Sequence, residues 1–139
     1  MRQKLREFLW EIFASHYLEL VKTRAYNEQK IFTKEQSESA RYALHFLLER
    51  FLTLAYPIIP QITSTIAKEC GIDLHNTEFP KAKKGKSDLN QIKTLMDFNS
   101  LVWKAKKDKQ ISLREKIDGI DIPKELSAFK GDLKACHNL

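Results

Sequence analysis

The stretch from Leu5 to Tyr26 constrains the fold more than any other part of this sequence. At the helical step of about 100° per residue, its apolar side chains gather in one broad stripe and its polar ones fall opposite. The stripe consists of Leu5, Leu9, Ile12, Phe13, Tyr17, Leu20 and Val21, and the polar face of Lys4, Glu7, Glu11, Ser15 and Lys22. Because this stripe is wider than a coiled-coil seam, we expect the helix to be the inner helix of a bundle, buried against two neighbours.

A second helix is predicted after a polar connection. Thr33 and Gln36 have the spacing of a capping box, in which each side chain bonds the other residue's backbone N–H. Apolar residues then recur at helical spacing from Ala40 to Ala55. Pro57 cannot continue a helix, so we expect the end near Ala55.

A third, short helix is predicted from Pro60 to the glycine at position 71. Proline is favoured in a first helical turn, and glycine readily takes the left-handed conformation that closes a helix. Ile62, Ile66 and Cys70 share one face of it. Residues 72–87 then lose the helical pattern and indicate a surface connection.

The remaining chain predicts a fourth helix and a mixed tail. Asp88 is the expected cap of the helix, which carries apolar residues as far as Trp103. Beyond it, residues 117–122 favour a turn and a short strand, Pro123 opens a small helix, and residues 133–139 favour another strand. The predicted fold is therefore mainly α: a helical bundle over residues 1–80, then a basic linker, helix and small α+β subdomain over 81–139.

Composition narrows the class of protein. A chain of 139 residues with 42% hydrophobic content can bury one core, and no apolar run is long enough to span a membrane. No secretory signal pattern opens the chain, so we expect a cytoplasmic location. Cys70 and Cys136 have no partner at zinc or disulfide spacing, and no phosphate loop or nucleophile elbow is present. We expect no catalytic residue, metal or cofactor here.

The positive charge is confined to the second half of the chain. Residues 1–80 hold 10 Lys+Arg and 10 Asp+Glu, whereas residues 81–139 hold 14 and 8, which accounts for the whole net charge of +6. A local basic block favours a polyanionic partner, because lysines that neutralise phosphates release counterions. The alternative is a Lys-rich surface that only keeps the chain in solution.

Three polar residues lie in or beside apolar stripes. We expect His16 to be a core histidine hydrogen-bonded to a neighbouring helix, and Asn99 to make a buried hydrogen bond or fill a gap. Arg24 has Lys22 and Tyr26 nearby, and such a group can hold a phosphate or stack on an unpaired base. Its alternative role is an ion pair within the bundle, for instance to Glu49 or Glu38.

Several motifs resemble one protein family. The run from Phe13 to Tyr26, FASHYLELVKTRAY, resembles the first helix of the anticodon-binding domain of class I aminoacyl-tRNA synthetases for valine, isoleucine and leucine. Its Tyr-Leu-Glu with a following Lys is more similar to the valyl enzymes than to the isoleucyl ones. The segment from Leu52 to Thr63, LTLAYPIIPQIT, is similar to the Leu-x-Leu-x-x-Pro-x-x-Pro connection of that family. Residues 103–113 and 130–134 resemble the basic helix with its Ser-Leu step and the C-terminus of archaeal-type valyl enzymes.

Two features depart from the family pattern. Gln61, Ser64, Thr65 and Lys68 stand where the family has Phe and a Glu-Glu-x-Trp-like sequence. The HIGH and KMSKS motifs that bind nucleotide in such synthetases are missing, as are the catalytic and editing domains.

The resemblance implies a tRNA-binding fragment of a valine–tRNA ligase that holds the anticodon arm of valine tRNA while the rest of the synthetase chain, which uses ATP, performs aminoacylation. Isoleucyl and leucyl enzymes stay open as alternatives, as does a helical protein-interaction bundle with no RNA partner. Lysines would fix the RNA through its phosphates, and Arg24 would read a base. The expected RNA-binding residues are Lys22, Arg24, Lys81, Lys83, Lys84, Lys104, Lys106 and Lys107.

Overall fold

A computed structural model describes residues 2–81 and 89–139, which form two compact units. The terminal unit comprises residues 2–40 and 89–139, and the hairpin unit comprises residues 41–81. These two units differ from the two regions expected from the sequence, residues 1–80 and 81–139. The expected domain boundary between residues 80 and 81 stays a prediction. Within the described residues, no helix is both long and apolar enough to cross a membrane.

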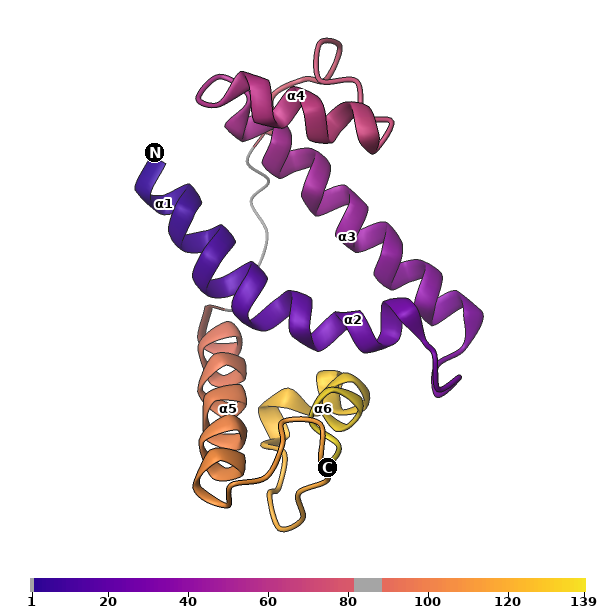
Figure 1. The fold of residues 1–139 in the computed structure, drawn as a ribbon, viewed down its shortest axis with the longest axis vertical. Helices are drawn as coiled ribbons and strands as arrows, with labels where there is room; N and C mark the ends of the chain where they lie inside the picture. Colours follow the sequence, from indigo (N-terminus) through magenta and orange to yellow (C-terminus); the bar gives the residue numbers. More distant parts are fainter. Residues whose placement is uncertain (1, 82–88) are drawn as a thin grey trace. The chain divides into compact units, whose positions relative to one another are not determined.

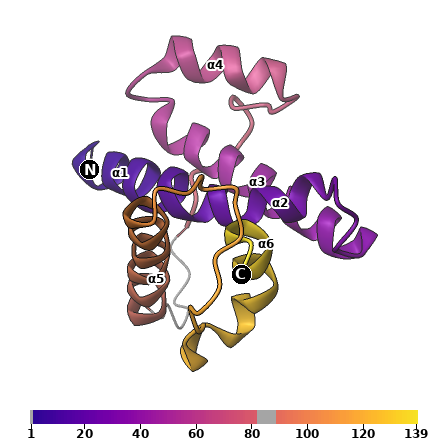
Figure 2. The ribbon, with the colours of Figure 1, turned by 60° about the horizontal axis from the view of Figure 1, so that its bottom comes forward.

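The terminal unit is built on one continuous N-terminal helix. It consists of α1 (Arg2–Glu7), the π-helical segment η1 (Phe8–Leu18) and α2 (Glu19–Tyr26). Two helices from the far end of the chain pack against it, as Figures 1 and 2 show: α5 (Leu89–Asp108) contacts η1, and α6 (Lys130–His137) contacts α2. The short 3-10 helix η2 (Lys124–Phe129) packs against both α5 and α6.

The π-helical segment departs from the regular α-helix that the spacing predicts. Its side chains interact at intervals of five residues: the rings of Phe8 and Phe13 stack with centroids 6.4 Å apart, and the Ser15 hydroxyl donates to the carbonyl of Trp10 at 2.7 Å. Such i to i+5 contacts are characteristic of a π-helix, which turns less per residue than an α-helix. A stripe calculated at the α-helical angle therefore loses its register along this segment.

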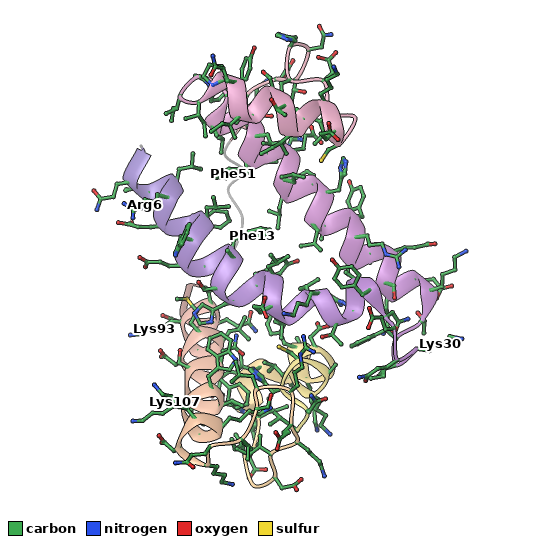
Figure 3. The ribbon with its side chains drawn as sticks, in the orientation of Figure 1. Arg6, Phe13, Lys30, Phe51, Lys93 and Lys107 are labelled. Carbon is green, nitrogen blue, oxygen red and sulfur yellow. The ribbon has the colours of Figure 1, made fainter. Side chains whose placement is uncertain are left out.

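Burial in the N-terminal helix follows only part of the predicted stripe. Leu20 and Val21 are each 1% exposed, but Leu5, Leu9, Ile12, Phe13 and Tyr17 are only half-buried. Figure 3 shows Phe13 on the side of the helix that faces away from α5. The well-buried section is therefore its C-terminal part, against which α6 packs.

Helix α3 (Lys34–Ala55) begins in the terminal unit and continues into the hairpin unit. The predicted capping box is confirmed: the Thr33 N–H donates to Gln36 Oε1 at 2.9 Å, and the Gln36 N–H donates to Thr33 Oγ1 at 3.3 Å. The predicted end at Ala55 is also confirmed. The side chain of Asn27 holds the connection before α3, because it both donates to and accepts from the backbone of Phe32.

The hairpin unit pairs the second half of α3 with α4 (Pro60–Glu69). Leu52, Ala67 and Leu74 form its core, with half-buried Leu48, Tyr56 and Ile72 packed against them. As predicted, Pro60 lies in the first turn of α4, and Gly71, the residue after the C-cap of this helix, has a positive φ of 67°. The face shared by Ile62 and Ile66 is exposed, however, and α4 instead buries Thr63 and Ala67.

The predicted α+β tail is wrong. Residues 109–123 form turns and irregular backbone, and residues 130–137 are helical, so the described part of the tail contains no strand. Leu133 and His137 are four residues apart and both buried, which is the pattern of a helix face. Between the two segments predicted as strands, the Ile117 N–H donates to the Asn138 carbonyl at 3.2 Å.

Candidate nucleic-acid interface

Lys106 is placed inside the terminal unit. Its side chain is 0% exposed, and its ammonium group donates to three backbone carbonyls: Leu113 at 2.8 Å, Glu115 at 2.6 Å and His137 at 2.6 Å. Three acceptors satisfy all three ammonium protons, which is what a buried lysine requires. Burial lowers the pKa of Lys106 below its usual value. This burial argues against a phosphate contact by Lys106. Its ammonium group instead connects the loop after α5 to the end of α6.

Two histidines and an asparagine continue this polar interior. His137 Nε2 lies 2.7 Å from Asn99 Oδ1, and Asn99 Nδ2 lies 3.4 Å from His16 Nδ1. In this network His137 donates to Asn99, whereas His16 accepts from Asn99, and a ring nitrogen that accepts a hydrogen bond belongs to a neutral imidazole. Burial lowers the pKa of both, that of His137 to about 4 with a further contribution from the Lys106 charge. The predictions of a core His16 bonded to a neighbouring helix and of a buried bond for Asn99 are confirmed.

Arg24 faces α6. Its Nε atom is 3.3 Å from Asp132 Oδ1, an ion pair in which the guanidinium side chain is 28% exposed and the carboxylate 8%. The two atoms are not aligned for a hydrogen bond. Burial raises the pKa of Asp132, and the neighbouring Arg24 charge opposes that rise. The alternative considered for Arg24, an ion pair within the fold, is therefore present, with a partner from the other end of the chain.

Lys22 and Tyr26 remain at the surface of α2. Lys22 pairs with Glu19 on the same helix, and the Tyr26 side chain is 73% exposed. Both line a cavity of about 530 Å³ between α2, the end of α5 and α6, to which Trp103 and Arg114 also contribute. Aromatic and cationic groups around a cavity of this size can accommodate an unpaired base and its phosphate.

The other predicted lysines are distributed along the chain. Lys104 and Lys107 are exposed on the last turns of α5, and Figure 3 shows Lys107 extending to the side of α5 opposite α6. Lys81 is exposed in the hairpin unit and lies 3.6 Å from the carboxylate of Glu78. Lys83 and Lys84 lie outside the described residues, as does the predicted cap Asp88.

Sequence reasoning did not select three further cations, Arg114, Lys130 and Lys134. They are exposed, and they lie on or next to α6. Lys130 and Lys134 are four residues apart in a helix, a spacing that could have indicated a shared basic face, but the helix itself was not predicted. Among the described residues, no three His, Cys, Asp or Glu side chains gather as metal ligands would.

Comparison with known proteins decides the family. Residues 1–121 match the family model of the anticodon-binding domain of tRNA ligase. The chain belongs to this family. The resemblance drawn from residues 13–26 and 52–63 is thus confirmed.

Relatives of this chain include valine–tRNA ligases. Those of Nanoarchaeum equitans, Aeropyrum pernix and Pyrobaculum aerophilum are 37%, 33% and 34% identical to this chain, over 100%, 94% and 97% of its length. The chain spans only 17–18% of the length of these relatives. It is thus homologous to one region of a valine–tRNA ligase, as the sequence motifs predicted. No solved structure matches it.

Proposed function

We propose that this chain binds the anticodon arm of valine tRNA as part of a cytoplasmic valine–tRNA ligase. The family match over residues 1–121, together with the similarity to three valine–tRNA ligases, supports this function. The chain holds and orients the RNA, while ATP-dependent activation of valine belongs to the remainder of the synthetase. The excess of cations in residues 81–139 agrees with a phosphate-binding role.

Within this proposal the exposed lysines contact phosphates, and the 530 Å³ cavity lined by Lys22 and Tyr26 receives a base. Lys22, Lys104 and Lys107 of the terminal unit are retained as phosphate contacts, together with Lys81, Lys83 and Lys84. Lys106 is not retained, because its ammonium group is fully engaged by carbonyls. Arg24 would read a base only with the part of its guanidinium that Asp132 leaves free.

Salt-dependent binding tests this function. Titrating valine tRNA and a non-cognate tRNA at several salt concentrations should give a linear fall of log affinity with log salt, and tighter binding of the valine tRNA. Changing Lys104 and Lys107 to Ala should reduce the slope by up to about 0.7–0.9 for each phosphate that is no longer neutralised, equally for both tRNAs. Absence of binding to either tRNA by the unaltered chain would refute the proposal.

A variant of Arg24 distinguishes reading from positioning. If its guanidinium stacks on or pairs with a base, Arg24→Ala should weaken binding of valine tRNA by about 1–3 kcal/mol, with little change in slope. Asp132→Asn is the matched control, because it disturbs the same ion pair without removing the guanidinium. Equal losses in the two variants would assign Arg24 to the structure of the fold alone.

A further inference from the structure

The loop after α5 is fixed in place by buried interactions. The Lys106 ammonium group holds the carbonyls of Leu113 and Glu115, which flank Arg114 on both sides. The Arg114 carbonyl itself accepts from Asn138 Nδ2 at 2.9 Å, and its N–H donates to Ser112 Oγ at 3.3 Å. The backbone of Arg114 is therefore anchored to the end of α6, while its side chain stays exposed.

Besides the 530 Å³ cavity described above, two further cavities open around this anchored loop and α6, and the larger of them shares Arg114 with it. One, of about 680 Å³, is lined by Arg114, Lys116 and Lys134 over apolar Ile31 and Phe32. The Phe32 ring packs beside Gly131, where an added Cβ would lie 3.7 Å from it. The other cavity, of about 520 Å³, is lined by Lys124, Lys130 and again Lys134. Because the cavities share Lys134 and Leu139, they form one continuous surface.

The charge of this surface is strongly unbalanced. Its five cations are Arg114, Lys116, Lys124, Lys130 and Lys134, and the side-chain carboxylate among its lining residues is that of Asp121. Lys116 lies 2.8 Å from Asp118; the other four have no carboxylate within ion-pair distance among the described residues. Asp132, by contrast, lies buried on another face of α6, where Arg24 neutralises it. The fold thus separates α6 into an inner acidic position and an outer basic face.

We propose that these five residues, the α6 surface, form a second RNA-binding surface that contacts phosphates of the tRNA backbone. The inference rests on the proposed tRNA-binding function and adds a surface distinct from the lysines of α5. An extended polyanion fits better than a single phosphate, because the cations are spread along two open cavities instead of converging on one point. The exposed Ile31 beside the cations offers an apolar contact for a base that is not paired.

A triple variant tests the α6 surface. Changing Lys124, Lys130 and Lys134, none of which lines the 530 Å³ cavity, to Ala should lower the slope of log affinity against log salt by about 2–3 and weaken tRNA binding by about 10- to 100-fold at moderate salt. The matched control replaces Lys4, Arg6 and Lys93 by Ala. These three residues are exposed, belong to the same unit and line neither cavity, and replacing them removes the same amount of charge. The slope of log affinity against log salt for this control variant should therefore remain near that of the unaltered chain.

The outcomes separate this inference from the function on which it rests. If the unaltered chain binds tRNA and the α6 triple variant keeps both its slope and its affinity, the inference is wrong while the proposed function stands. Equal losses in the α6 variant and in the control would also overturn it, because the effect would then be one of net charge. If the unaltered chain fails to bind tRNA, both fall. Circular dichroism of each variant verifies that the helices are intact.

Discussion

The interiors of the two units of this protein are held together by different kinds of contact. The hairpin unit has a small apolar core of Leu52, Ala67 and Leu74, contributed by segments close together in the sequence. The terminal unit buries Lys106, His137 and Asn99 among its apolar residues, and these groups join segments from opposite ends of the chain. Local apolar contacts suffice for a helical hairpin, whereas the union of distant segments here depends on polar groups that each require a specific partner.

The largest expected effect comes from removing the central cation of the terminal unit. Lys106→Met keeps an unbranched apolar side chain but leaves three carbonyls without their donor, so the free energy of unfolding should fall by about 3–5 kcal/mol. Urea unfolding measures this change. Lys107→Met, at the exposed neighbouring position, should alter stability by less than about 0.5 kcal/mol. Similar values for the two variants would contradict the buried placement of Lys106.

The same difference explains what the sequence could predict. Spacing and capping rules are local, so they correctly gave the start and end of α3 and the proline-initiated α4. The burial of Lys106 was not predicted, because a lysine among three others in residues 104–109 looks like surface charge, and nothing nearby in sequence shows that carbonyls of residues 113, 115 and 137 converge on it. The partner of Arg24 was missed for the same reason, since Asp132 is more than a hundred residues away.

The second prediction concerns the independence of the hairpin unit. Leu52 is 1% exposed, so Leu52→Ala should lower stability by about 2–4 kcal/mol through reduced burial and the cavity left behind. Because the core around it is drawn from residues 48–74, amide hydrogen exchange should accelerate in the hairpin unit and stay slow in α6. Equal acceleration in both units would show that they unfold as one, and the comparison between them would lose its basis.

Acid should weaken the terminal unit through His137. Its pKa is lowered by burial to about 4, below the ordinary value of 6.5, so the folded protein favours the neutral ring. This contribution to stability is complete above about pH 6.5 and is lost as the pH falls toward 4, and the loss at pH 4 should be about 2–3 kcal/mol. His137→Gln keeps a donor for Asn99 but does not titrate, so its stability should fall less over this range. Parallel curves for the two proteins would show that His137 is not held neutral.

The smallest effect is expected at the exposed face of α4, where the spacing of apolar residues is misleading. Ile62 is 59% exposed, and isoleucine and serine have similar helix propensities, so Ile62→Ser should change the free energy of unfolding by less than about 0.5 kcal/mol. Ala67, five residues on and 3% exposed, is the matched test of the opposite face: Ala67→Leu should cost about 1–3 kcal/mol, because the extra volume has no space beside Leu52 and Leu74. Chemical denaturation of both variants places the buried face of α4. If Ile62→Ser proved the costlier change, the face chosen by apolar spacing would be the inner one, and the hairpin core would have to be assigned to Ile62 and Ile66 in place of Thr63 and Ala67.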